Sequence, residues 1–456
     1  MKVIPAPAVR RTPSGPLRRE VWLPAVLALV IVSAFQAVGV WKINLGPAAI
    51  AVYPMVWALL AGGFVSAQRR WPLTPRMWAV AESLMAVGVS LLVARLSLTL
   101  GPNIDVLFDA GPALLLQEVG HLVGTVAIAL PLAVALRMGR ATVGATFSID
   151  REASFAIVGD RFGVKSDEYR GVLSMYVFGT MFGAVIVALI ASLTSSLGIF
   201  DPLALAMGAG VGSGSMMAAG AAAISAAHPE VGEQVLALAA TSNLITMILG
   251  VYVGVWIALP LADRLYRLLT RSASRPAVVS GERTESSSSA PIDAADPADT
   301  HAAPFGDDDV KVTIPLYLSV PIVAAICIAA ATIAAGEPTT SIPIGFTLIV
   351  GLMLVATALS HLTRGKITAV IWASVLGVSV SGPWFPGSAW IVHNTESIDF
   401  MSMCAVVLGF AGLAVGKNLP ALRMIGWKIV PVGFAAIFAS FVLSTLIAEF
   451  ALGFWR

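Results

Sequence analysis

The chain has 456 residues, of which 57% are hydrophobic and only 12% are charged, and its formal net charge at pH 7 is +2. Soluble domains carry about 25% charged residues, so this composition excludes a soluble globular protein and predicts one that crosses a membrane several times. A net charge this small, without a concentrated basic patch, excludes nucleic acid as an expected partner.

The first 20 residues are rich in Pro and Arg, and the positive-inside rule places this tail in the cytoplasm. The apolar run at 21–40 is longer than the core of a signal peptide, so it predicts the first membrane span. The complete set of hydrophobic segments is 21–40, 47–67, 77–98, 105–136, 171–197, 202–227, 231–261, 313–335, 342–359, 367–381 (or on to 392), 400–416 and 425–452. The sequence therefore predicts an all-α, polytopic membrane helix bundle of about 11–12 hydrophobic segments.

Residues 271–312 differ from the rest of the chain, because they are polar and rich in Ser, Pro and acidic residues. Such a stretch cannot bury enough apolar surface to offset the entropy of ordering, which predicts a disordered linker. The linker divides the chain into an N-terminal transmembrane half, 21–270, and a C-terminal transmembrane half, 313–456.

Residues 207–217 hold four glycines and two serines in the middle of hydrophobic sequence. Irregular backbone at membrane depth persists only where it is buried in protein or lines a wet cavity. This stretch therefore predicts a broken helix or a re-entrant hairpin that binds a ligand.

The distribution of basic residues supports the same interpretation. Arginines flank the linker, so the linker is expected in the cytoplasm. Seven full crossings from a cytoplasmic N-terminus would place the linker outside, whereas six would place it inside. Segment 202–227, with its glycine-serine middle, is the natural candidate for the segment that does not cross.

A second glycine-rich stretch, 409–416, lies in the fourth of the five segments after the linker, as 202–227 is the fourth of the five before it. Interrupted helices at matching positions of two halves are typical of secondary transporters. The sequence thus predicts two glycine-rich broken or re-entrant segments in two related halves. A non-crossing segment conflicts with a clean inverted repeat of five crossings each, so the relation between the halves stays open.

The glycine-serine stretch supplies most of the candidate substrate-binding residues, through its backbone groups and its two hydroxyls. Asn243 in the next segment is a further candidate, although Asn in a membrane helix also joins helices. Close packing of helices through small residues is the alternative for the glycines. The candidate substrate-binding set is Gly210, Gly212, Ser213, Gly214, Ser215 and Asn243.

Ionisable residues within the predicted spans are candidates for ion coupling, because charge inside a membrane is costly. Glu118 and His121 are three residues apart and share a helix face, with a satisfied polar pair as the alternative. Glu82 and Lys417 complete the ion-coupling set, although Lys417 also fits an ordinary cytoplasmic loop position. Arg95, near the end of its segment, is expected either to pair with a group on another helix or to extend to the membrane interface.

Three stretches carry a resemblance to a known family: 117–121 (QEVGH), 144–152 (GATFSIDRE) and 210–217 (GVGSGSMM). With them the chain resembles an uncharacterised family of prokaryotic multi-pass membrane proteins, known as a domain of unknown function. The chain is more loosely similar to the cation/proton antiporter and anion transporter group. That likeness implies ion-coupled transport of a small solute, by analogy of architecture.

The expected function is ion-coupled secondary transport of an organic anion or amino-acid-like compound across the bacterial inner membrane. The partners are the lipid bilayer, the solute and a second copy of the chain, since homodimers are common among such carriers. No cofactor is expected beyond H⁺ or Na⁺ as coupling ion. A channel or passive facilitator and a non-transporting structural protein are the alternatives. An enzyme is not expected, because the sequence shows no nucleophile–base set or metal-ligand cluster.

Overall fold

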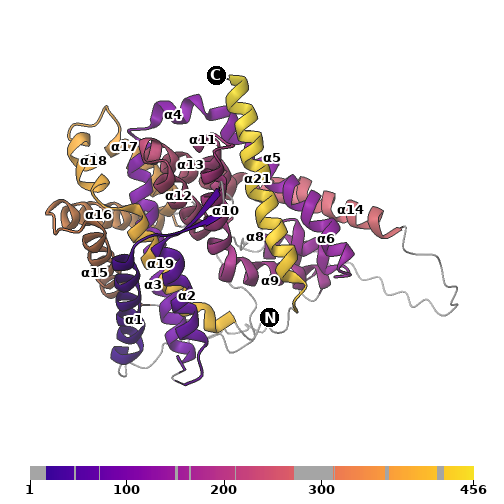
Figure 1. Ribbon diagram of the computed structural model, residues 1–456, viewed down its shortest axis with the longest axis horizontal. Coiled ribbons are helices and arrows are strands. Elements are labelled where there is room, and N and C mark those ends of the chain that lie inside the picture. Colours follow the sequence, from indigo (N-terminus) through magenta and orange to yellow (C-terminus); the bar gives the residue numbers. More distant parts are fainter. Residues whose placement is uncertain are drawn as a thin grey trace, which may run out of the picture.

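The computed structural model describes residues 17–45, 48–70, 72–148, 153–163, 166–210, 212–271, 312, 314–364, 369–418 and 426–455. Most of the predicted tail and nearly all of the predicted linker lie outside these residues. The described chain is helical apart from one antiparallel hairpin of β1 (Trp41–Leu45) and β2 (Ala48–Val52). The prediction of an all-α membrane bundle is confirmed (Figure 1).

The helices before the linker are α1 (Leu17–Val38), α2 (Pro54–Ala67), α3 (Pro75–Leu100), α4 (Ile104–Asp109), α5 (Gly111–Gly124), η1 (Thr125–Ala129), α6 (Leu130–Ala135), α7 (Ala141–Thr146), α8 (Ala153–Phe162), α9 (Asp167–Phe178), η2 (Gly179–Gly183), α10 (Ala184–Leu197), α11 (Pro202–Ala209), α12 (Gly214–Ala227), η3 (Pro229–Val231), α13 (Gly232–Val253), η4 (Gly254–Ala258) and α14 (Leu259–Arg271). After it come α15 (Leu316–Ala335), α16 (Ser341–Leu362), α17 (Ala369–Ser381), α18 (Ser388–Glu396), α19 (Phe400–Ala414), η6 (Val415–Asn418) and α21 (Ile429–Trp455).

Seven helices of the described chain are long and apolar enough to cross a membrane, or eight if the bent pair α18–α19 counts as one span. This number is smaller than the set of hydrophobic segments, because several segments form short helices. α2, α12 and part of α17 are apolar but too short to cross alone.

The two halves of the sequence share one core rather than forming separate bundles. α19 packs against α2 and α3, and α21 packs against α5 and α11, so helices from beyond the linker lie among N-terminal helices (Figure 1). One hydrophobic cluster accordingly contains buried residues from both halves, such as Leu84 and Phe410. The linker therefore separates the halves in sequence but not in space.

We call the two ends of the bundle the Leu100 end and the Arg137 end. α3 runs toward Leu100, and α5 and α6 return the chain to Arg137. α21 begins at the Arg137 end, where Lys428 Nζ donates a hydrogen bond of 3.2 Å to the Arg137 carbonyl. α21 finishes at the Leu100 end, where the Glu449 carboxylate accepts a hydrogen bond of 2.8 Å from the Asp201 amide.

α11 and α12 form a hairpin that enters and leaves at the Leu100 end. α12 runs beside α10 in the same direction, because Gly183 lies against Met216 and Val187 lies against Gly220. α10 ends directly before α11 begins, so α12 finishes where α11 starts. Gly183 is near the middle of the 31-residue span Asp167–Leu197. The turn of the hairpin therefore lies at mid-depth, as the glycine-serine stretch predicts.

The lengths of the two hairpin helices agree with a segment that does not cross. α11 has 8 residues and α12 has 14, which makes them about 12 Å and 21 Å long. Both are shorter than the hydrocarbon core of a bilayer, about 30 Å.

The helix is not broken at the second glycine-rich stretch, 409–416, so the predicted position of the second interruption is wrong. α19 continues through Gly409 and Gly412 to Ala414. A Cβ at Gly412 would lie 2.3 Å from the Leu59 carbonyl of α2, so these glycines bring two helices into close contact. The bend in this half comes earlier, where α18 and α19 meet at 58°.

Candidate functional site

The turn between α11 and α12 forms the centre of the candidate site. Gly212 has φ +76°, a conformation that glycine adopts without strain. Ser213 then takes an extended conformation and precedes α12. Ser213, Gly214 and Ser215 are half-buried, and the two serine hydroxyls lie 3.1 Å apart. Polar backbone and side-chain groups are thus accessible at mid-depth.

Two buried residues of α13 fix the end of α11 and the turn. Asn243 Nδ2 donates hydrogen bonds to the carbonyls of Gly210, at 2.8 Å, and Gly212, at 3.2 Å. Ser242 Oγ donates to the Met207 carbonyl at 2.8 Å. The Gly210 and Gly212 carbonyls follow the last turn of α11, where carbonyls lack intrahelical donors, whereas the Met207 carbonyl also accepts a hydrogen bond of 3.1 Å from the Gly210 amide. α13 therefore supplies donors to the end of α11 and to the turn.

A chain of hydrogen bonds joins α13 to α5. Thr246 Oγ1 donates to the Ser242 carbonyl at 2.8 Å, and Gln117 Nε2 donates to Thr246 Oγ1 at 3.4 Å. Ser242, Thr246 and Gln117 are fully buried. The turn and the polar face of α5 thus belong to one buried polar network.

α5 extends this network to α21. His121 Nδ1 is hydrogen-bonded to Ser440 Oγ, and Ser444 Oγ donates to the Gln117 carbonyl at 3.1 Å. The two helices approach closely because a Cβ at Gly120 would lie 2.6 Å from the Leu443 carbonyl. Glu118, on the same helix, is 2% exposed.

The predicted substrate-binding residues therefore lie together, and hydrogen bonds connect them to the helix that carries Glu118 and His121. Glu82 lies elsewhere, on an exposed stripe of α3 formed with Ala86 and Ser90. Val89 of α3 lies beside the turn, since its Cγ1 would be 3.8 Å from a Cβ at Gly214. Glu82 is about two helical turns from Val89, or roughly 10 Å. The backbone of Lys417 lies in η6, and its side chain is outside the described residues.

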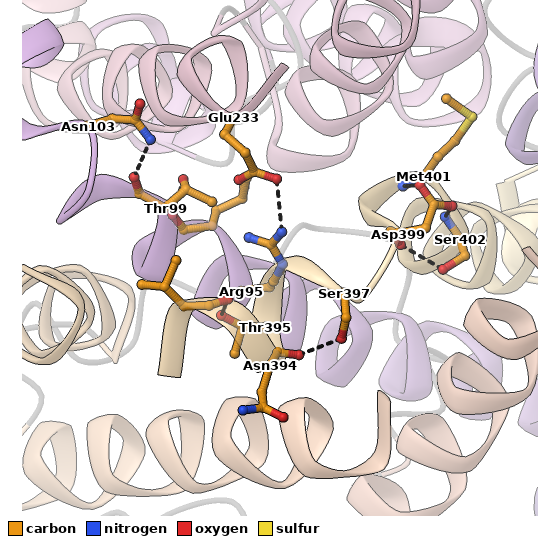
Figure 2. Close-up of polar contacts among 12 residues, drawn as sticks. Arg95, Thr99, Asn103, Glu233, Asn394, Thr395, Ser397, Asp399, Met401 and Ser402 are labelled. Atoms are coloured by element: carbon orange, nitrogen blue, oxygen red, sulfur yellow. Dashed lines mark hydrogen bonds and ion pairs between the residues drawn. The ribbon is translucent and has the colours of Figure 1, made fainter. Parts of the chain in front are cut away.

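Of the two expectations for Arg95, pairing with another helix is confirmed and extension to the interface is wrong, because Arg95 is 1% exposed. Its Nη2 lies 3.1 Å from Glu233 Oε1 at the start of α13. Figure 2 shows this pair beside the α18–α19 bend, with Asn394 and Asp399 nearby. Arg95 also interacts electrostatically with Asp399 and with Glu396. Sequence alone could not pair Arg95 with Glu233, which is 138 positions away.

A second ionic cluster lies at the Arg137 end. Arg140 binds Glu168 at 2.7 Å and Asp263 at 2.9 Å, which ties α14 to α9. Burial acts to lower the pKa of Arg140, but the hydrogen bonds and charges of the two carboxylates outweigh burial and raise that pKa. The cluster also includes the Tyr266 ring, 5.4 Å from the guanidinium. The stretch 144–152 begins on α7 beside this cluster.

Fold and site together define a helical membrane protein with several spans and a hairpin that turns at mid-depth. The chain belongs to the family described as "Protein of unknown function (DUF3100)", whose profile matches residues 32–268. This match confirms the resemblance inferred from the three sequence stretches. It includes the hairpin, α5 and α13. No curated protein and no solved structure matches the chain.

Proposed function

We propose that the protein is an ion-coupled secondary transporter of a small solute. The observation that carries this proposal is the half-buried turn at mid-depth, which Asn243 holds by two hydrogen bonds. Non-helical backbone at such depth is tolerated where it is buried or lines a water-filled cavity. Discontinuous helices near the midplane form the solute and ion sites of many secondary transporters.

The direction of α12 favours a solute with a negatively charged group. Its N-terminus lies at the turn, and the Ser213 side chain makes no capping hydrogen bond to its amides. The amides of a helix N-terminus attract anions, and the hydroxyls of Ser213 and Ser215 add donors beside them. A Cβ at Gly214 would meet only Val89, at 3.8 Å, which leaves space at this point. An organic anion or amino-acid-like compound fits these groups.

Glu118 and His121 supply the coupling in this proposal. Both are buried at the level of Ser440, near the middle of α21. The network through Gln117, Thr246 and Ser242 connects their helix, α5, to the turn. A change of protonation at α5 would rearrange these hydrogen bonds and thereby alter the site. Na⁺ is the alternative coupling ion, bound by backbone carbonyls at the end of α11.

The same proposal places the protein in the inner, or plasma, membrane with the Arg137 end and the N-terminus in the cytoplasm. Arg69 and Arg70 lie between α2 and α3 at that end, and Arg76 lies in the first turn of α3, as the positive-inside rule requires. A homodimer remains the proposed assembly.

Two measurements test the function. A panel of organic acids and amino acids is first screened for ligands that raise the unfolding temperature of the purified protein. Uptake of a stabilising ligand is then measured in proteoliposomes under an imposed H⁺ or Na⁺ gradient. A carrier gives saturable uptake that collapses with the gradient. Flux that is gradient-independent and does not saturate would contradict the carrier and support a channel.

A further inference from the structure

Burial along α3 differs sharply between its two ends. Every residue from Ala94 to Leu100 is buried, so neighbouring elements surround the helix completely at the Leu100 end. Closer to the Arg137 end, Glu82, Ala86 and Ser90 form an exposed stripe with a spacing of four residues. This stripe leads to Val89, which lies beside the turn. The surface of α3 is therefore covered on the Leu100 side of the turn and carries exposed positions on the Arg137 side.

Arg95 lies at the centre of the covered end. Its ion pair with Glu233 joins α3 to the first turn of α13, the helix that follows the hairpin directly. Arg95 is fully buried, whereas the Glu233 side chain is 39% exposed. The pair thus holds α13 against α3 over the region where a path from the Leu100 end to the turn would have to open.

Other charged groups face this pair from the α18–α19 bend. Glu396 interacts electrostatically with Glu233, Arg95 and His393, and Asp399 interacts with Arg95. Arg95 Nε is buried and has no hydrogen-bond partner among the described residues. The guanidinium has five N–H donors, and it therefore has capacity for a second carboxylate. Glu396 and Asp399 each interact electrostatically with Arg95, and the Asp399 carboxylate also accepts hydrogen bonds from the Met401 and Ser402 amides (Figure 2).

We propose that Arg95 and Glu233 form a latch that closes the Leu100 end of the solute path, and that the carboxylates of the α18–α19 bend receive Arg95 when the latch opens. The inference rests on the proposed function, because only a transported solute needs alternating access to the turn. Exchange of one buried cation between two sets of carboxylates gives two discrete arrangements, as a two-state transition requires. The latch does not contact the solute, so its effect is on which end is open.

Thiol labelling tests the latch without measuring transport. The two native cysteines, Cys327 and Cys404, are buried and are replaced by Ala. Ser213→Cys then reports access to the turn. A charged, membrane-impermeant thiol reagent is applied to the full chain in right-side-out and in inside-out vesicles. With the latch intact, Cys at 213 is expected to react from the Arg137 side and at least about tenfold more slowly from the Leu100 side.

Glu233→Gln and Arg95→Ala should each raise labelling from the Leu100 side by about tenfold. Glu396→Gln is the matched variant with the opposite expectation, because it removes a competitor for Arg95 and should keep that side closed. Arg76→Ala is the control, because it breaks an ion pair of 3.6 Å with Glu20 at the surface. It should leave the labelling rate of the cysteine at position 213 unchanged from both sides.

Equal labelling from both sides of the intact protein, or unchanged labelling in both Glu233→Gln and Arg95→Ala, would overturn the latch. Glu233 is partly exposed, so Glu233→Gln is expected to fold and is the variant on which the test relies. A protein that labels as expected but moves no solute would refute the transporter and leave the closure by Arg95 and Glu233 standing. Saturable transport with labelling unchanged in both variants would support the transporter and refute the closure by Arg95 and Glu233.

Discussion

The Asn243 side chain holds the end of α11 through a hydrogen bond of 2.8 Å to the Gly210 carbonyl. The same amide reaches the Gly212 carbonyl at 3.2 Å, so one buried side chain spans the irregular backbone of the turn. The hairpin and α13 are therefore held together by these hydrogen bonds, and a substitution in one should affect the stability of the other.

Asn243→Ala should destabilise the protein, because it leaves two carbonyls without their donor. The expected loss is about 1–3 kcal/mol in the free energy of unfolding, measured by denaturant titration in detergent. Asn394→Ala is the control, since the Asn394 amide returns to Trp390 of its own helix at 2.8 Å. An equal loss in both variants would contradict the special role of Asn243.

Gly210→Ala should damage the contact between α11 and α13. The Cβ of the new alanine would lie 2.2 Å from Ser242 Oγ and 2.8 Å from the backbone nitrogen of Asn243. This overlap is expected to cost about 1–3 kcal/mol in the free energy of unfolding. Gly351→Ala, on α16, has nothing within 4 Å and should be neutral. Ser242→Gly in the Gly210→Ala background should recover part of the loss of unfolding temperature. Absence of any recovery would show that Ser242 is not the clashing group.

The contact between α2 and α19 predicts an order of effects among glycines. Gly412→Ala would place a Cβ 2.3 Å from the Leu59 carbonyl, which cannot move without shifting α2. Gly409→Ala meets the Val32 side chain at 3.0 Å, which can adjust. Gly412→Ala should therefore lower the unfolding temperature more than Gly409→Ala. The reverse order would contradict close packing as the role of this stretch.

Arg140→Ala should loosen α14 from α9, because Glu168 loses its charged partner and Asp263 keeps only Arg267 of its own helix. The expected cost is roughly 1–3 kcal/mol of unfolding free energy, the range for hydrogen bonds to charged groups. Limited proteolysis after α14 should become faster. Arg170→Ala breaks an exposed pair with Asp167 and should have little effect. Unchanged proteolysis in Arg140→Ala would show that the ion pairs of Arg140 do not hold α14 in place.

Glu118→Gln should alter the pH dependence of solute uptake while the protein stays folded, because the amide has a similar shape and no exchangeable charge. The measurement is initial uptake rate between pH 5 and 8, alongside the unfolding temperature. Glu82→Gln, on the exposed stripe of α3, provides a comparison at a site away from the buried network. An unchanged profile in Glu118→Gln would remove Glu118 from the coupling.

The hairpin could be predicted from the sequence because two independent patterns indicated it. Glycine and serine at 207–217 disfavour a continuous helix. The arginines beside the linker place it in the cytoplasm, which requires that one of the seven hydrophobic segments before it does not cross the membrane. Glycines at 409–416 look similar but pack two helices, and composition alone does not distinguish a turn from a close contact.

Glu233 as the partner of Arg95 and the serines of α21 were not predicted, because these residues are far apart in sequence from the groups they contact. Arg95 forms an ion pair with Glu233 beside the α18–α19 bend, and Ser440 is hydrogen-bonded to His121. Neither contact can be recognised from the sequence around one partner alone. In one sequence, a lone arginine near the end of a span is typical of an interfacial residue. Only the packing of α3 against α13 shows that Arg95 is buried.

Sidedness of the two hairpin ends tests the central claim most directly. Ile199→Cys and Ala227→Cys mark the ends of the hairpin, and Arg69→Cys marks the opposite end of the bundle, each in the chain without native cysteines. With an impermeant thiol reagent on intact and inverted vesicles, positions 199 and 227 should react from one side and position 69 from the other. Reaction of 199 and 227 from opposite sides would show that the segment crosses the membrane and would contradict the account.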